Sequence, residues 1–196
     1  MAKTKNISKR NVRRILKKYI DEDFIRDYGD AFVILLNAHL GSGKSSSIEQ
    51  FKHLKVLYIT SSTELVEQMC QRYKWLTSYI GEDGTTRKNK QQLRNIKQLA
   101  INYHSLHKLT EQGNLEYDVL IIDECFNVWE SSSTYKPNDR NEKEFRWRIK
   151  STPKVIFMGG DFPEFLTEDI KTLIKKRFKG FMILRYRRIA LFFLNF

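Results

Sequence analysis

The chain has 196 residues, enough for one domain with a core of its own, and 41% of them are hydrophobic while 30% are charged. Its two cysteines, Cys70 and Cys125, lie far apart, which excludes a small disulfide-stapled fold and favours reduced intracellular thiols. The formal net charge of +12 favours a polyanionic partner.

The positive charge is concentrated at the two ends of the chain. Residues 1–20 and residues 170–196 each contain eight Lys or Arg residues and no acidic residue. Such ends favour nucleic acid as the partner, although a solvated helix face and a loose tail fit the same composition. Apolar residues at helical spacing predict a basic amphipathic helix over 6–19, within an N-terminal extension of residues 1–29.

Residues 185–196 are predicted to form a basic and apolar tail. The tail is shorter and more charged than a membrane span, and no secretory signal opens the chain. We therefore expect a soluble intracellular protein, in the cytoplasm or associated with the nucleus, and encoded by a cell, virus or plasmid. The apolar residues 189–194 would pack on the sheet, contact a partner or mark a truncated gene product.

The most informative segment is an apolar run at 31–38 followed by a glycine-rich turn that ends in Lys44 and Ser45. The run predicts a buried strand. Backbone N–H groups surround an anion only where the chain turns tightly, and Gly41 and Gly43 permit the positive φ that such a turn needs. The pattern predicts a phosphate-binding loop, whereas a plain flexible turn would explain the glycines alone.

This loop assigns roles to its residues. Lys44 is expected to reach the β- and γ-phosphates of a nucleotide, and the Ser45 hydroxyl to bind Mg²⁺. The helix that opens near Lys44 would point its positive dipole end at the phosphates. The predicted nucleotide-binding residues are Ala38, His39, Leu40, Gly41, Ser42, Gly43, Lys44, Ser45 and Ser46.

A second apolar run, over 117–122, ends in the carboxylates Asp123 and Glu124. Asp123 is predicted to hold Mg²⁺, and Glu124 to polarise the water that attacks the γ-phosphate. Because a kinase has less use for a carboxylate beside a water, the pair favours hydrolysis of ATP. An exposed acidic pair that caps the next helix is the alternative.

The remaining elements alternate between strand and helix. Further strands are predicted at 55–60, 99–103, 155–158 and 181–184. Helices are predicted at 64–75 (capped by Ser61, Ser62 or Thr63), 90–98, 106–111, 141–149 and 163–178, with an irregular segment at 127–138. This alternation predicts an α/β fold over 30–184, with a mostly parallel sheet covered by helices on both faces.

The order of the motifs resembles the first motor lobe of superfamily 2 helicases, and within them the viral replication origin-binding protein type. The resemblance spans 31–184. It rests on the loop form Ala-x-x-Gly-x-Gly-Lys-Ser and on the segments 59–65, 103–107, 122–125 and 158–162. It implies a RecA-like P-loop NTPase fold with ATP and Mg²⁺ as ligands.

The resemblance also implies contacts with nucleic acid, more with DNA than with RNA. The implied contact residues are Ser61, Ser62, Thr63 and Ser105, and Asp161 would couple the ATP state to strand binding. The chain departs from the family at Ser62, where relatives tend to carry an arginine, and at Gly159, where they carry an acid.

The larger departure is that the chain has room for only one lobe, while relatives take arginines for phosphoryl transfer from a second lobe. We expect very slow hydrolysis unless a separate second lobe or self-association completes the site. A binding module that holds ATP without turnover and regulates a partner is the second hypothesis, and a small nucleotide kinase is the third.

Two further groups of residues receive no catalytic role. Tyr103, His104 and His107 are interpreted as a polar surface without metal. The three tryptophans, Trp75, Trp129 and Trp147, would stack on bases or belong to the core.

Overall fold

The computed structural model describes residues 12–15, 33–38, 42–81, 88–93, 95–110, 116–134, 139–174 and 182–186. Within them, eight strands form one sheet in the order β1-β8-β2-β7-β6-β3-β5-β4, and every pairing is parallel. The strands are β1 Val12–Ile15, β2 Val33–Ala38, β3 Val56–Thr60, β4 Thr77–Ser78, β5 Gln98–Asn102, β6 Val119–Ile122, β7 Lys154–Gly159 and β8 Met182–Tyr186.

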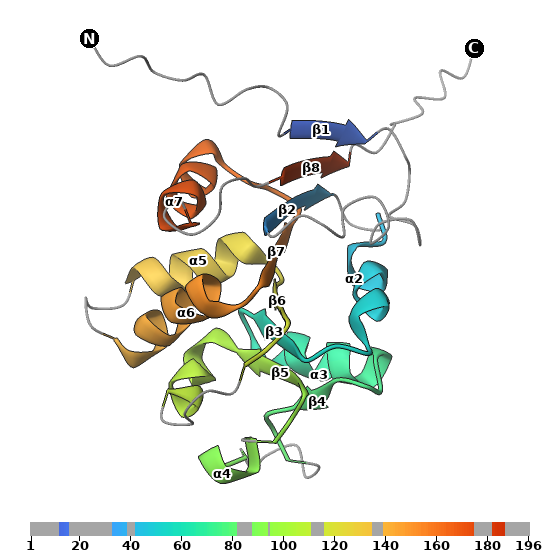
Figure 1. Cartoon of the computed structure of the whole chain (residues 1–196), viewed down its shortest axis with the longest axis vertical. Helices are drawn as coiled ribbons and strands as arrows, with labels where there is room; N and C mark the ends of the chain where they lie inside the picture. Colours follow the sequence, from blue (N-terminus) through green and yellow to red (C-terminus); the bar gives the residue numbers. More distant parts are fainter. Residues whose placement is uncertain are drawn as a thin grey trace.

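Helices lie on both faces of this sheet, so the predicted α/β fold is confirmed. Figure 1 shows α5, α6 and α7 on one face and α2 and α3 on the other. The helices are α2 Lys44–Ser47, α3 Thr63–Arg72, α4 Lys90–Leu93, α5 Cys125–Thr134, α6 Arg140–Ser151 and α7 Glu164–Ile174, with 3-10 helices η2 Ile48–Phe51 and η3 Tyr103–Leu109. No helix among the described residues is long and apolar enough to cross a membrane.

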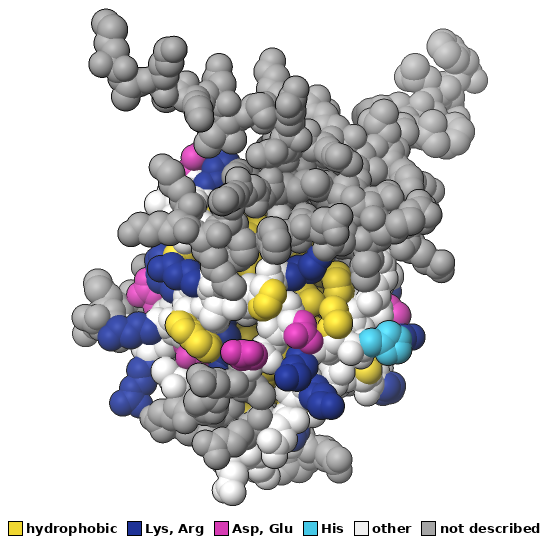
Figure 2. Space-filling model, in the orientation of Figure 1, with side chains coloured by type: hydrophobic (Ala, Val, Ile, Leu, Met, Phe, Trp, Pro, Cys, Tyr) yellow, Lys and Arg dark blue, Asp and Glu magenta, His cyan; other side chains and the backbone are white. Residues whose placement is uncertain are grey.

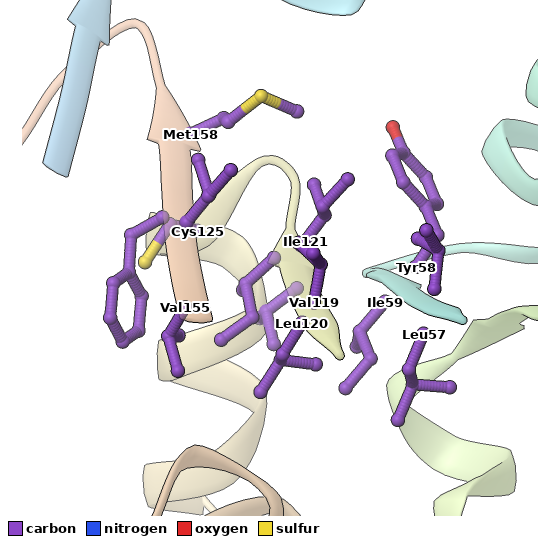
Figure 3. Packing of buried hydrophobic residues seen from close by; sticks show 14 of the residues in the cluster. Leu57, Tyr58, Ile59, Val119, Leu120, Ile121, Cys125, Val155 and Met158 are labelled. Carbon is purple, nitrogen blue, oxygen red and sulfur yellow. The ribbon is translucent and has the colours of Figure 1, made fainter. Parts of the chain in front are cut away.

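The core is built from the central strands. All residues of β3 and β6 are buried, and β2 and β7 are buried at all but one position each. A parallel strand covered on both faces cannot alternate apolar and polar residues, which is why these segments read as unbroken apolar runs. Figure 3 shows the side chains of β3, β6 and β7 meeting in this core.

The predicted N-terminal helix is wrong at Val12–Ile15. These residues form β1, which pairs with β8 so that Val12 lies opposite Ile183 and Ile15 opposite Tyr186. Their spacing fits a helix, but β-branched residues also suit a strand, and the free edge of β8 supplies a partner. The other residues of the extension and residues 187–196 of the tail lie outside the described residues.

The prediction of an irregular segment at 127–138 is also wrong as far as Thr134, because α5 runs through that residue. Serine and asparagine lower helix propensity by competing for backbone hydrogen bonds. Here the Ser132 hydroxyl donates to the Trp129 carbonyl oxygen at 2.7 Å, and Ser131 to Asn127 at 2.9 Å. Burial of Val128 and Trp129 against the sheet outweighs that local preference.

Other differences concern boundaries. The helix expected at 90–98 ends at Leu93, and Gln98 already belongs to β5. The helix expected at 106–111 is part of the 3-10 helix η3. The short strand β4 was not predicted. Ser62 caps α3 as expected, since its Oγ accepts a hydrogen bond from the Leu65 N–H at 3.3 Å.

The topology brings the predicted motifs to one edge of the sheet. The carboxyl ends of parallel strands share an edge, and β7 lies between β2 and β6. The carboxyl ends of β2, β6 and β7 therefore meet there, as is usual for ligand sites in open α/β sheets.

Candidate active site

The segment predicted to bind phosphate lies between β2 and α2 in the sequence, and its described residues Ser42 and Gly43 lead into α2. Gly43 has φ of 89°, a value that favours glycine, and the Ser47 N–H donates to the Gly43 carbonyl oxygen at 3.0 Å to form the first helical turn. α2 begins at Lys44, as expected. The predicted residues His39, Leu40 and Gly41, and the side chain of Ser45, lie outside the described residues.

Lys44 is a buried cation at the centre of this loop. Its side chain is only 7% exposed, and its Nζ donates to the carbonyl oxygen of Ala38, where the loop begins. Among the described residues, no carboxylate forms an ion pair with it. A buried charge is costly unless it is paired, so an anion held in the loop would complete the environment of Lys44.

Ser42 is a second residue whose environment fits a bound anion. Its hydroxyl is buried and has no hydrogen-bond partner among the described residues. Buried hydroxyls are nearly always satisfied, and a phosphate oxygen next to the loop would accept this hydrogen bond. Ser42 and Lys44 therefore both fit a phosphate.

Asp123 follows β6 and is held rigidly. Its N–H donates to the Ile59 carbonyl oxygen at 2.9 Å, its Oδ1 accepts from the Glu124 N–H at 2.9 Å, and its Oδ2 accepts from the Tyr58 hydroxyl. Burial raises the pKa of Asp123, while these two donors and Lys44 oppose the increase. The carboxylate is thus fixed near Lys44, where a divalent cation would add a further positive charge.

Tyr58, which donates the hydrogen bond to Asp123 Oδ2, was not predicted as a site residue. It is fully buried in β3, the strand next to β6, and Figure 3 shows its hydroxyl at the far end of the side chain. Burial first, and then the Asp123 carboxylate, raise the pKa of Tyr58 well above its ordinary value. Tyr58 therefore keeps its proton, remains neutral and donates a hydrogen bond to the Asp123 carboxylate.

Glu124 has an unusual backbone. It is the one non-glycine residue with positive φ, 48°, in the described part of the chain, and its carbonyl oxygen accepts the first helical bond of α5 from Val128 at 3.2 Å. Such backbone strain tends to occur at functional sites. Burial, and then the neighbouring Asp123, raise the pKa of the Glu124 carboxyl, while Lys44 lowers it.

The end of β7 lies against the phosphate loop. A Cβ on Gly160 would approach the Ala38 carbonyl oxygen to 4.0 Å, and one on Gly159 would lie 3.1 Å from the Phe162 ring and 3.3 Å from the Asp161 carbonyl oxygen. An acidic side chain at Gly159 would therefore need its neighbours to shift. Asp161 itself is exposed.

The predicted nucleic-acid contacts divide into two groups. Ser61, Ser62 and Thr63 lie half-buried at the carboxyl end of β3. Thr63 Oγ1 accepts from Asn102 Nδ2 at 3.0 Å and lies 3.2 Å from the Tyr79 hydroxyl. Ser105, in contrast, is only 2% exposed, so this conformation does not present its hydroxyl to a ligand.

An arginine that the sequence did not single out approaches the phosphate loop. Arg72 Nη2, at the end of α3, donates to the Ser46 hydroxyl at 2.9 Å. Trp75 Nε1 donates to Glu49 Oε2 at 2.8 Å. These contacts attach α2 to the end of α3 and η2 to the segment that follows α3.

The aromatic and histidine residues lie in different environments. Trp129 is buried and Trp75 half-buried, both packed with the core, whereas Trp147 is 45% exposed. The His107 N–H donates to Asn141 Oδ1 at 2.7 Å. No group of metal-ligating His, Cys, Asp or Glu side chains occurs among the described residues.

Comparisons with known proteins place the chain in a family. Residues 4–154 match the family model described as Type III restriction enzyme, res subunit. A search of curated proteins found no significant match.

Similar solved structures include a hypothetical ATP-dependent RNA helicase from Sulfolobus tokodaii, with 15% identity and a TM-score of 0.57, covering 79% of this chain and 48% of that one. The UvsW helicase of Bacteriophage T4 has 13% identity and a TM-score of 0.54, covering 81% and 55%. A DEAD box protein from Methanococcus jannaschii has 12% identity and a TM-score of 0.53, covering 84% and 47%.

These similarities show a common fold, and the chain spans about half the length of the similar structures. The family match extends over most of the chain and includes both the phosphate loop and the Asp123–Glu124 pair. The chain belongs to the family of the Type III restriction enzyme res subunit, and its fold is the RecA-like fold of these similar structures.

Proposed function

We propose that this protein is a Mg-ATP-binding, nucleic-acid-dependent ATPase that acts as a helicase motor lobe. The observation that carries the proposal is the buried ammonium of Lys44, which has no carboxylate partner among the described residues and lies in a loop whose Gly43 and Ser42 also fit a phosphate. A nucleoside triphosphate would supply negative charge to pair with the Lys44 ammonium.

The acidic pair fits the metal that accompanies such a nucleotide. Ser45 and Asp123 would hold Mg²⁺, and Mg²⁺ would neutralise charge on the phosphates during transfer. Glu124 would orient the attacking water and accept its proton. The raised pKa of the Glu124 carboxyl makes it a better proton acceptor than an ordinary glutamate.

The order of the motifs supports a replication origin-binding type of helicase, with DNA as the nucleic acid and with Ser61, Ser62, Thr63 and Asp161 as strand-contacting and coupling residues. The similar structures are about twice as long as the part this chain covers, so a second lobe or self-association would complete the site. Residues 30–184 would form the ATPase domain between the two basic ends.

The test is ATP hydrolysis by the purified chain with and without single-stranded and duplex DNA, and with RNA of the same sequence. We expect slow turnover that DNA stimulates, because loss of an arginine finger costs on the order of 10³ to 10⁵ in rate. ATP and DNA binding without any turnover would favour the non-hydrolysing module instead. Absence of ATP binding would contradict both.

The Tyr58 hydroxyl provides a prediction about the metal. Tyr58→Phe removes the donor that orients the Asp123 carboxylate, and loss of such supporting bonds typically weakens metal binding about 10- to 100-fold. We expect the Mg²⁺ concentration for half-maximal binding of a fluorescent ATP analogue to rise accordingly. Tyr117→Phe is the matched control, because Tyr117 is a buried tyrosine whose hydroxyl has no hydrogen-bond partner among the described residues. Equal Mg²⁺ dependence in both variants would exclude a role of the Tyr58 hydroxyl in Mg²⁺ binding.

A further inference from the structure

The exposed face of α6 has an unusual composition. Its exposed side chains are Arg140, Lys143, Arg146, Trp147 and Lys150, so every exposed position of the helix carries a cation or a tryptophan. The spacing of three and four residues places them on one stripe, about 15 Å long from end to end. The opposite face contains Phe145 and Ile149 and is buried.

Helix stability does not explain the N-terminal part of this stripe. Arg140 and Lys143 lie in the first turns of α6, where the helix dipole disfavours positive charge. Arg146 pairs with Glu142 at 2.8 Å, but no described carboxylate forms an ion pair with Lys143 or Lys150. In Figure 2, Lys and Arg side chains gather at the left of the molecule, where Figure 1 places α6.

Trp147 is held with one ring face against the protein. The Arg148 guanidinium carbon lies 4.6 Å from the Trp147 ring centroid, and Arg148 is itself fixed by a buried ion pair with Glu144 at 2.7 Å. The indole is nevertheless 45% exposed. A cation behind the ring and an open side in front suit the stacking of a base.

The stripe begins beside the edge where the strand-contacting segments end. Asn141 Oδ1 accepts from the His107 N–H at 2.7 Å, which joins the start of α6 to η3. η3 follows β5 at the carboxyl edge of the sheet and exposes His104. A strand that crosses this edge can continue directly onto α6.

We propose that the α6 stripe of Arg140, Lys143, Trp147 and Lys150 is a second binding surface for single-stranded nucleic acid, with the lysines on phosphates and Trp147 stacked on a base. The proposal extends the nucleic-acid partner of the proposed function to a surface outside the helicase motifs. Stacking favours a nucleic acid over an acidic protein, which would use the charges but not the indole.

The test is fluorescence anisotropy of labelled single-stranded DNA and RNA, without nucleotide, over a range of salt concentrations. The variant Lys143→Glu/Lys150→Glu should bind at least tenfold more weakly, and the slope of log K against log salt should fall by about 1.4, because each lost phosphate contact contributes about 0.7 for a single strand. The control Lys55→Glu/Lys97→Glu has the same charge change. Its residues are exposed and precede β3 and β5 at the opposite edge of the sheet.

Trp147→Phe should remove the quenching of tryptophan fluorescence on binding, and Trp147→Ala should weaken binding about tenfold. Equal affinity and salt slope in the α6 and control variants would overturn the proposal, as would absence of strand binding by the unmodified chain. Lys44→Ala separates the two proposals: it should lose ATP and keep strand binding through α6. Melting temperatures verify that each variant is folded.

Discussion

Lys44→Ala is expected to abolish detectable ATP hydrolysis and to weaken ATP binding roughly 30-fold to several thousandfold, because truncating one partner of a buried charge pair costs about 2–5 kcal/mol. The Lys44 ammonium is buried and donates a hydrogen bond to the Ala38 carbonyl oxygen. Calorimetry with ATP and with ADP would measure the loss. A variant that binds ATP as tightly as the unmodified protein would exclude a phosphate site at this loop.

The same substitution separates binding from folding. In the absence of a ligand, the Lys44 ammonium is buried without an ion pair among the described residues, so its removal should leave the melting temperature unchanged or raise it. Lys52→Ala is the control, because Lys52 follows η2 closely but is exposed and pairs with Glu49 at 3.2 Å on the surface. It should change neither ATP binding nor stability by a measurable amount.

Glu124→Gln is the second large effect, and it acts on chemistry rather than on binding. The amide keeps the size of the side chain and leaves the 48° φ of the backbone in place, but it cannot accept a proton. We expect hydrolysis to fall about 10²- to 10⁴-fold while ATP affinity changes little. Single-turnover hydrolysis of labelled ATP, with ATP binding measured in parallel, distinguishes a loss of chemistry from a loss of binding.

Glu130→Gln provides the matched control for this experiment. Glu130 lies on the exposed side of the same helix, α5, so the charge change is equal and the site is untouched. Hydrolysis that survives in Glu124→Gln would assign the activation of water to another group. Equal and negligible hydrolysis in the unmodified chain and both variants would favour the non-hydrolysing module.

The sequence predicts the centre of the fold well because the physics there is local. β2, β3, β6 and β7 are parallel strands buried on both faces, so each is a short apolar run ending in a distinctive turn. The glycines and Lys44 predict a phosphate loop, and Asp123 and Glu124 at a strand end predict an acidic pair beside it. Each of these signals fits within a segment of about ten residues.

The features that were missed depend on distant partners. β1 forms only because β8 offers an edge, and α5 forms because Trp129 is buried, although its serines favour other structures. Tyr58 reads as one more aromatic residue in a strand, and its role appears only when β6 places Asp123 beside it. The exclusion of Ser105 from the surface likewise depends on how η3 packs.

The position of β8 has a consequence for how the protein is made. β8 lies between β1 and β2, and Val12 pairs with Ile183, which is 171 positions later in the chain. At synthesis rates of about 5–20 residues per second, β2 waits on the order of ten seconds or more before β8 leaves the ribosome. During that time the edge of β2 is open to pairing with other nascent chains, so this half of the sheet closes only after β8 has been synthesised.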